Sequence, residues 1–222
     1  GCLSTASSRR GSQTTSASMD STARVSPDQR PQLLERLRQR MSPWRFEHSL
    51  RVEALAVDLA RFWHVPEHKA SIAALLHDTA RDLPDVQLAA IVAASEDPLL
   101  ADWKQSTAPV VLHAPVGALI ARQEFGVTDP EILTAIALHT TGAAEMSRLA
   151  MIIFLADYCE PGRHFPGVEP VRSLLRTSLE AATLRALAQT IQYLRERDLP
   201  VDAHTLEAEA AFAARCKRPG QP

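Results

Sequence analysis

The stretch ASIAALLHD, residues 70–78, places a histidine and an aspartate directly after a run of nearly unbroken apolar side chains. The run predicts a buried, central helix over residues 67–77, because a helix that is apolar on all sides must be covered on all sides. A carboxylate beside an imidazole at the end of such a helix is costly unless a partner neutralises it, and a metal ion is a common partner. The pair His77-Asp78 alone does not establish a metal site, since a hydrogen-bonded core histidine beside a helix-terminal aspartate explains the pair equally well.

Apolar residues recur at helical spacing on both sides of this stretch, from Pro31 onward. No alternating run of β-branched residues bounded by turns indicates a strand. We therefore expect an all-α fold, a helical bundle. The expected helices span residues 31–41, 44–62, 67–77, 85–94, 112–124, 130–139, 147–158, 170–198 and 202–216.

The two ends of the chain differ from this pattern. Residues 1–30 contain eight Ser, four Thr and few apolar side chains, too few to offset the entropy cost of ordering. We expect a disordered N-terminal tail over residues 1–30, one folded domain over residues 31–217 and a disordered C-terminus over residues 218–222. Met19 is an alternative start of the chain, and a lipid-anchored Cys2 is a less favoured alternative.

The charge and the cysteines exclude several classes of protein. The 222 residues carry 24 Lys and Arg against 26 Asp and Glu, which excludes a nucleic-acid binder that depends on bulk positive charge. No apolar stretch approaches the ~20 residues that cross a bilayer, and the N-terminal segment has no apolar secretion signal. The three cysteines form no CxxC pair, which argues against a thiolate zinc site or a disulfide framework. We expect a cytoplasmic protein with no nucleic-acid or membrane partner.

Other side chains that bind metals recur in the same setting as the first pair, at or near the ends of expected apolar helices. They are His48, His113, His139 and Asp157. Because the helix ends of a bundle can direct several side chains into one cavity, we expect these residues to meet His77 and Asp78. Of the remaining histidines, His64 and His68 are expected at the surface, and His164 and His204 lie in polar contexts, so none of the four is expected to bind a metal.

The composition of this set points to a type of metal and a type of reaction. Imidazole and carboxylate ligands without thiolates suit divalent Fe, Mn, Co or Zn. Six ligands exceed what one ion with open positions needs, so we expect two ions, with Asp78 as a bridge and a hydroxide held between them. Such a pair clamps a phosphoryl oxygen and activates water, which implies hydrolysis of a phosphoester or phosphoanhydride.

The order His48, His77-Asp78, Asp157 resembles the signature of the HD superfamily of metal-dependent phosphohydrolases. More narrowly, several segments are similar to the YqeK-type symmetrical bis(5'-nucleosyl)-tetraphosphatases, and together they cover roughly residues 45–172. The segments are RFEHSLRVEALAVDLA (45–60), AALLHDTARDLP (73–84), HAPVGALIA (113–121), AIALHTTG (135–142) and IIFLADYCEPGRHFPGVEPVR (152–172).

The resemblance implies a helical HD domain with a dinuclear, often iron-containing site that cleaves diadenosine tetraphosphate into two ADP. It implies a metal shell made of His48, His77, Asp78, His113, His139 and Asp157. It also implies that Arg81 and Arg163 act with Asp78 in catalysis by supporting the polyphosphate. The family usually has lysine where this chain has Arg81, and a planar guanidinium is a different donor from an ammonium group.

Further residues near these motifs have two interpretations each. Thr140, Thr141 and Gly142 either donate to a phosphate or form a helix C-terminus with glycine in the left-handed region. Arg163, Arg51 and Arg172 either bind substrate or form structural ion pairs, for Arg163 with Glu160 or Glu169. Aromatic residues flank the motifs and either stack on a base or, as we favour, pack in the core: Trp44, Phe46, Tyr158 and Phe165.

The sequence thus predicts a metal-dependent hydrolase that acts on a dinucleoside polyphosphate or another nucleotide. Two alternatives remain open: an HD-type nucleotide phosphatase or alarmone hydrolase on the same metal site, and a non-catalytic nucleotide-sensing domain. Retention of all six ligands speaks against the sensor. A homodimer is one of the oligomeric states that the sequence leaves open.

Overall fold

Every regular element in the described part of the chain is a helix, which confirms the all-α prediction. The computed structural model describes residue 1 and residues 30–106 and 108–217, so the disorder expected for residues 2–29 and 218–222 falls outside the described residues. The α-helices are α1 (Arg30–Arg40), α2 (Pro43–Phe62), α3 (Glu67–Leu76), α4 (Asp85–Ala94), α5 (His113–Gln123), α6 (Pro130–Leu138), α7 (Arg148–Cys159), α8 (Val168–Arg172), α9 (Leu179–Arg195) and α10 (Ala203–Cys216). Two 3₁₀-helices, η2 (Pro98–Trp103) and η3 (Pro109–Leu112), were not predicted.

The long helix expected over residues 170–198 is wrong, because the structure has two helices there. The turn between α8 and α9 ends at Ser178, whose side chain accepts a hydrogen bond from the N–H of Ala181. A serine in this position caps a new helix start, and the preceding residues leave the helical path. The division matters for the site because α8 follows the motif that contains Asp157 and Arg163.

The central helix α3 is covered on all sides, as its sequence predicts. Its apolar residues from Ala70 to Leu76 are at most 3% exposed. It packs against α2, α6 and α7, and the many alanines allow these helices to lie close together. A second, smaller apolar cluster joins α4, α5 and the two 3₁₀-helices around Leu88, Leu100 and Trp103.

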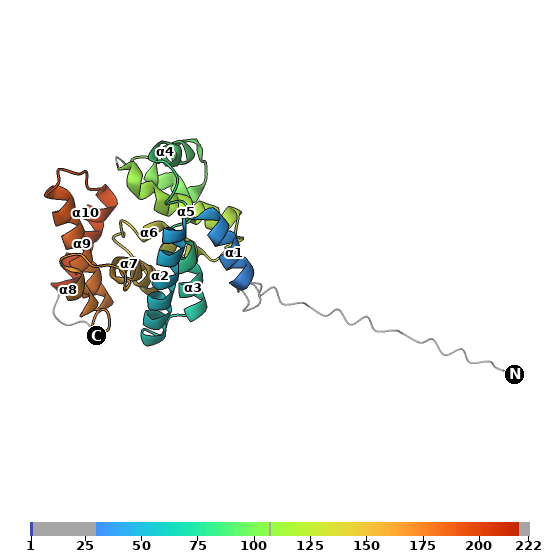
Figure 1. Ribbon diagram of the computed structural model, residues 1–222, viewed down its shortest axis with the longest axis horizontal. Helices are drawn as coiled ribbons and strands as arrows, with labels where there is room; N and C mark the ends of the chain where they lie inside the picture. Colours follow the sequence, from blue (N-terminus) through green and yellow to red (C-terminus); the bar gives the residue numbers. More distant parts are fainter. Residues whose placement is uncertain (2–29, 107, 218–222) are drawn as a thin grey trace.

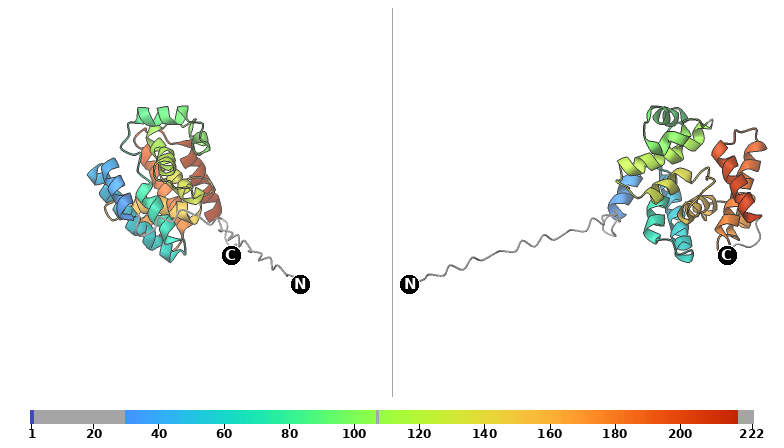
Figure 2. Two further views of the ribbon diagram at one scale, coloured as in Figure 1. Left: turned by 90° about the vertical axis from the view of Figure 1, so that its right-hand side faces the viewer. Right: turned by 180° about the vertical axis from the view of Figure 1, so that it is seen from behind.

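The remaining helices surround this centre. Figures 1 and 2 show α9 and α10 side by side along one flank and α1 on the opposite flank of the central helices, while α4 lies at one end. At Gly117, α5 passes so close to the end of α3 that an added Cβ would lie 3.0 Å from the carbonyl oxygen of His77. In the described residues, no helix combines the length and the apolar character needed to cross a bilayer.

Candidate metal centre

Asp78 lies between four of the predicted histidine ligands. Its Oδ2 atom is 3.4 Å from Nε2 of His77 and 3.8 Å from Nε2 of His48. Its Oδ1 atom is 3.5 Å from Nε2 of His113 and 3.6 Å from Nε2 of His139. The two oxygens of one carboxylate therefore face two different pairs of imidazoles, so Asp78 could serve as a ligand together with either pair.

Asp157, in the last turns of α7, lies beside the first pair of histidines, His48 and His77. Its Oδ1 atom is 3.0 Å from Nε2 of His48 and 3.9 Å from Nε2 of His77. In three overlapping triplets the ligand atoms lie within 4.8 Å of one another: His48, His77 and Asp78; His77, His139 and Asp157; Asp78, His113 and His139. The six predicted ligands thus meet in one cluster that is buried except at Asp157, although they come from five helices or helix ends.

Three of the histidines are oriented by the backbone of their own helix end. In His77, His113 and His139, Nδ1 lies 2.7, 2.6 and 2.8 Å from the carbonyl oxygen three residues earlier. A carbonyl only accepts hydrogen bonds, so Nδ1 carries a proton, and in the neutral imidazole the lone pair of Nε2 faces the cluster. The positions next to helix ends explain this geometry, because carbonyl groups there lack a full set of intrahelical partners.

His48 lies within a helix and is oriented by a carboxylate instead. Its Nδ1 atom is 3.2 Å from Oε1 of Glu160, a residue that is only 2% exposed. Glu160 also accepts hydrogen bonds from Nε of Arg51 at 2.7 Å and from the N–H of Gly162 at 2.6 Å. Burial alone raises the pKa of Glu160, but these donors lower it below its usual range. Sequence reasoning treated Glu160 only as an ion-pair partner; its place three residues after Asp157 was the available signal.

The donor atoms fit a divalent metal ion. Nε2 of His48 and Nε2 of His77 are buried and have no hydrogen-bond partner among the described residues. The 3.0 Å contact between His48 and Asp157 joins two atoms that lack hydrogen-bond geometry. Unpaired buried nitrogen atoms are costly, and a cation bound between them and the carboxylates would remove that cost. The cluster is therefore a candidate divalent metal site.

The titration of the cluster favours the same conclusion. Although burial raises the pKa of both carboxyl groups, the neighbouring histidines lower the pKa of Asp78 and of Asp157 below the usual range. Burial alone lowers the pKa of His77, but the carboxylate charges of Asp78 and Asp157 raise it to about 9. Burial and the charge of His139 lower the pKa of His113 to about 3. Both carboxylates are thus ionised, which is the form that binds a metal, and a metal ion would displace the Nε2 proton of His77.

Arg45 is a neighbour of the cluster that the sequence analysis missed. Its Nη1 atom donates a hydrogen bond of 2.7 Å to Oδ2 of Asp78. Its guanidinium also lies over the indole of Trp44, which stacks on the imidazole of His48. The spacing of three residues between Arg45 and His48 puts both on one face of α2, and this was the signal available.

Arg163 lies directly beside the cluster, as its predicted role requires. Its Nη2 atom donates to Oδ1 of Asp157 at 2.7 Å, and its Nε atom donates to the backbone oxygen of the same residue at 3.0 Å. The Glu160 carboxylate, one of the expected structural partners, is farther away at 4.0 Å. Burial lowers the pKa of Arg163, but the Asp157 carboxylate raises it above the usual value, so the side chain stays charged.

Two further predicted substrate residues lie near the other pair of histidines. The hydroxyl oxygen of Thr140 is 3.1 Å from Nε2 of His113 and 3.0 Å from Nε2 of His139. Arg81 is half-buried and forms no ion pair with any residue that the structure describes. Burial, the charge of His139 and the charge of Arg81 all lower the pKa of His113. The positive charge of Arg81 therefore acts on a candidate metal ligand.

Arg172 has contacts that favour the structural interpretation. Its guanidinium donates to the backbone oxygens of Cys159, Glu160 and Arg163 at 3.0, 2.8 and 2.9 Å. It also pairs with Glu169. Most of its hydrogen-bond donors thus hold the turn that carries Arg163. Arg172 therefore positions Arg163.

Thr141 and Gly142 also form structure in the segment after α6. The hydroxyl of Thr141 is buried and donates to the backbone oxygen of Gly142. Gly142 has φ +66°, and its N–H donates to the carbonyl of Leu138. This is a helix C-terminus with glycine in the left-handed region, the second of the two interpretations.

The other four histidines lie outside the cluster. His64, His68 and His164 are exposed. His204 lies at the start of α10 and is 2.7 Å from a carboxylate oxygen of Asp202. None of the four belongs to a group of potential ligands in the described residues.

Comparisons with known proteins agree with this site. Residues 45–162 match the HD domain family, a range that contains all six candidate ligands. A Halalkalibacterium halodurans protein named bis(5'-nucleosyl)-tetraphosphatase, symmetrical, is 37% identical over 179 residues, which are 80% of this chain and 93% of that protein. A Bacillus subtilis protein of the same name is 37% identical over 78% of this chain and 91% of its own length.

A solved structure agrees as well. A Clostridium acetobutylicum protein described as a "predicted HD superfamily hydrolase involved in NAD metabolism" superposes with a TM-score of 0.76 at 32% identity. The match covers 84% of this chain and 97% of the other. The helical fold and the order of its elements are therefore shared along most of the described chain.

Proposed function

The chain belongs to the HD domain family, and we propose that it is a symmetrical bis(5'-nucleosyl)-tetraphosphatase, a hydrolase that cleaves diadenosine tetraphosphate into two ADP. The observation that carries this proposal is the convergence of the six candidate ligands in one cluster around Asp78, in a chain that matches relatives of this name over nearly their full length.

Two divalent ions would be held by the two halves of the cluster. His48, His77 and Asp157 would hold one ion, His113 and His139 the other, and Asp78 would bind both. Bound ions of this kind supply an activated water and neutralise charge on phosphoryl oxygens. Iron is our first choice from the family resemblance, and the nitrogen and oxygen ligands also suit Mn, Co or Zn.

The protein side chains would bind and orient the polyphosphate. Arg163, beside Asp157, offers a planar guanidinium that can donate two parallel hydrogen bonds to a phosphate. Arg81 and Thr140 lie beside the opposite half of the cluster. Such prearranged donors stabilise charge that develops in phosphoryl transfer.

The position of these donors supports cleavage in the middle of the substrate. Arg163 donates to Asp157 in one half of the cluster, and the charge of Arg81 acts on His113 in the other half. A chain of four phosphates that binds both arginines would bring its central anhydride near the ligands. Cleavage there releases two nucleoside diphosphates.

The cytoplasmic location and the homodimer remain predictions from the sequence.

Product analysis tests the proposal. The protein is purified without oxygen, supplied with Fe²⁺ or Mn²⁺ and incubated with diadenosine tetraphosphate, and the nucleotides are separated by chromatography. We expect ADP as the sole nucleotide product from the wild type and from Asp102→Asn, which changes an exposed aspartate that belongs to no group of potential ligands in the described residues. Asp78→Asn should lose this activity.

Other products identify the alternatives. ATP with AMP would contradict symmetrical cleavage. Faster release of phosphate from mononucleotides would favour a nucleotide phosphatase, and hydrolysis of an alarmone alone would favour an alarmone hydrolase. Binding of nucleotides without turnover of any of them would favour the sensor.

A further inference from the structure

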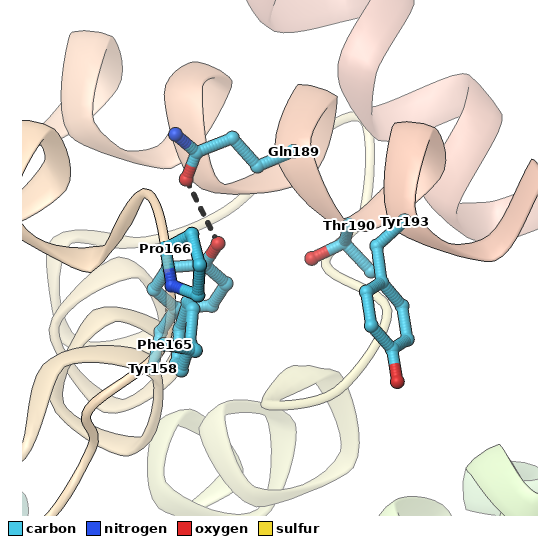
Figure 3. Close-up of a pocket in the computed structure, with 6 residues that line it drawn as sticks. All are labelled: Tyr158, Phe165, Pro166, Gln189, Thr190 and Tyr193. Carbon is cyan, nitrogen blue, oxygen red and sulfur yellow. Dashed lines mark hydrogen bonds between the residues drawn. The ribbon is translucent and has the colours of Figure 1, made fainter. Parts of the chain in front are cut away.

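A pocket with aromatic walls lies next to the motif that contains Asp157 and Arg163. It has a volume of about 290 Å³, close to the lower end of small-molecule sites. Figure 3 shows Tyr158, Phe165 and Pro166 on one side and Thr190 and Tyr193 of α9 on the other, with Gln189 above. None of these six lining side chains is charged, so the pocket suits a neutral group rather than a phosphate.

The segment that carries Asp157 and Arg163 also forms one wall of the pocket. Tyr158 directly follows the candidate ligand Asp157, and Phe165 is two residues after Arg163, a separation of at most about 7 Å. Asp157 and Arg163 are partly exposed, whereas the four histidine ligands are buried. The cluster therefore reaches solvent at Asp157 and Arg163, which lie close in the chain to the pocket residues Tyr158 and Phe165.

The aromatic walls are held in place by contacts of their own. The rings of Tyr158 and Phe165 pack edge to face with centroids 5.0 Å apart. The ring of Tyr193 is covered on one face by the guanidinium of Arg197, 3.8 Å from the centroid, while the residue is still 52% exposed. Such a half-covered ring offers a flat, apolar surface to a ligand.

The amide of Gln189 fixes the distance between the two walls. Its Oε1 atom accepts a hydrogen bond of 2.9 Å from the hydroxyl of Tyr158. Its Nε2 atom lies against Gly167, where a Cβ would approach to 2.8 Å and where φ is +99°. The turn from Phe165 to Gly167 is thus fitted to α9, which gives the pocket a preformed shape.

We propose that this pocket binds the purine base at one end of the polyphosphate substrate. The inference rests on the proposed function and adds a base subsite to it. A nucleoside diphosphate unit combines an anionic phosphate chain with a flat neutral ring, and the protein segment 157–166 carries both a cationic side chain and aromatic rings. Arg163 is placed for the phosphates, the aromatic rings for the faces of the base, and the hydroxyl of Thr190 with the amide of Gln189 for its polar edge.

Equilibrium binding of ADP tests the subsite without requiring turnover. Calorimetric titrations of the protein with excess Mn²⁺ compare ADP with inorganic diphosphate, which lacks the base. In Tyr193→Ala we expect ADP to bind more weakly by about fivefold or more, as for the loss of one aromatic stacking surface, and diphosphate to bind as in the wild type. Tyr193→Phe should restore ADP binding because it keeps the ring.

The matched control is Phe62→Ala, which removes another partly exposed aromatic ring. Phe62 lies 14 residues after His48 on α2, about 21 Å along the helix, so its removal should leave ADP binding unchanged. Equal ADP affinity in Tyr193→Ala and the wild type would overturn the subsite. So would an equal loss of ADP and diphosphate affinity, or the absence of ADP binding to the wild type. Failure of the proposed function is a separate result, since it appears as a wild type that does not cleave diadenosine tetraphosphate.

Discussion

The Asp78 carboxylate is the residue on which the two halves of the cluster depend, because each of its oxygens faces a different pair of histidines. Asp78→Ala should therefore remove most of the bound metal and most of the activity while the helical fold is retained. Metal analysis, turnover and circular dichroism measure the three properties. The control is His68→Ala, which changes an exposed histidine in the first turn of α3 and should alter none of them. Equal losses in both variants would contradict the division of the histidines into metal ligands and surface residues.

Glu160 is predicted to act through His48. Glu160→Gln keeps the shape of the side chain but removes the charge that orients the imidazole, and such changes beside a metal ligand weaken metal affinity by about 10- to 100-fold. Titration with Mn²⁺ measures the change. Glu145→Gln, which alters an exposed glutamate paired with Arg215, should bind Mn²⁺ like the wild type. Wild-type affinity in Glu160→Gln would show that the backbone alone positions His48.

The sequence could predict the metal ligands but not all of the residues that orient them. His48, His77 and the other ligands lie at or near the ends of helices with apolar runs, and this pattern can be read from the sequence alone. Glu160 and Arg45 contact the ligands through the way α2 packs on α7 and on the end of α3. That packing depends on side-chain fit between distant segments, which periodicity does not report.

At the level of elements, helix ends determine where the chain turns. Asp202 caps α10 by accepting hydrogen bonds from the N–H of His204 at 3.0 Å and from the hydroxyl of Ser106 at 2.6 Å. Loss of these bonds in Asp202→Ala should lower the free energy of unfolding by about 1–2 kcal/mol. Urea unfolding at neutral pH measures it, and wild-type stability in the variant would contradict a role of this cap.

The same variant gives a prediction about pH. Burial raises the pKa of Asp202, but the hydrogen bonds from Ser106 and His204 lower it below the usual 3.8. A lowered pKa in the folded state stabilises the protein above the usual value, and the stabilisation is lost as the pH falls through the folded value. The difference in unfolding free energy between wild type and Asp202→Ala should therefore be full near neutral pH and should shrink in acid. A difference that grows in acid would contradict this sign.

Most helices were predictable because their apolar periodicity and their caps agree. Asp129 and Ser147 cap α6 and α7 at the predicted starts. The break between α8 and α9 was missed because apolar residues continue at helical spacing on both sides of it, and only the capping geometry of Ser178 reveals it. The 3₁₀-helices are too short for periodicity to identify.

At the scale of the whole molecule, the metal ligands connect α2, α5, α6, α7 and the end of α3. An ion that binds only the folded chain stabilises it by about 2.7 kcal/mol at a concentration of 100 times its Kd. For a domain of this size, that corresponds to a rise in Tm of about 5–10 °C per ion. Thermal unfolding with a chelator and with added Mn²⁺ measures the rise. The same rise in Asp78→Ala would show that Mn²⁺ binds elsewhere.

The metal content of the protein tests the central claim most directly. Purification without oxygen followed by elemental analysis gives the number of transition-metal ions per chain. For the wild type we expect about two ions, because two sets of ligands share one carboxylate, and for Asp78→Ala we expect nearly none. A wild-type content near zero, with no activation by Fe²⁺, Mn²⁺ or Co²⁺, would contradict a metal centre built from these six residues.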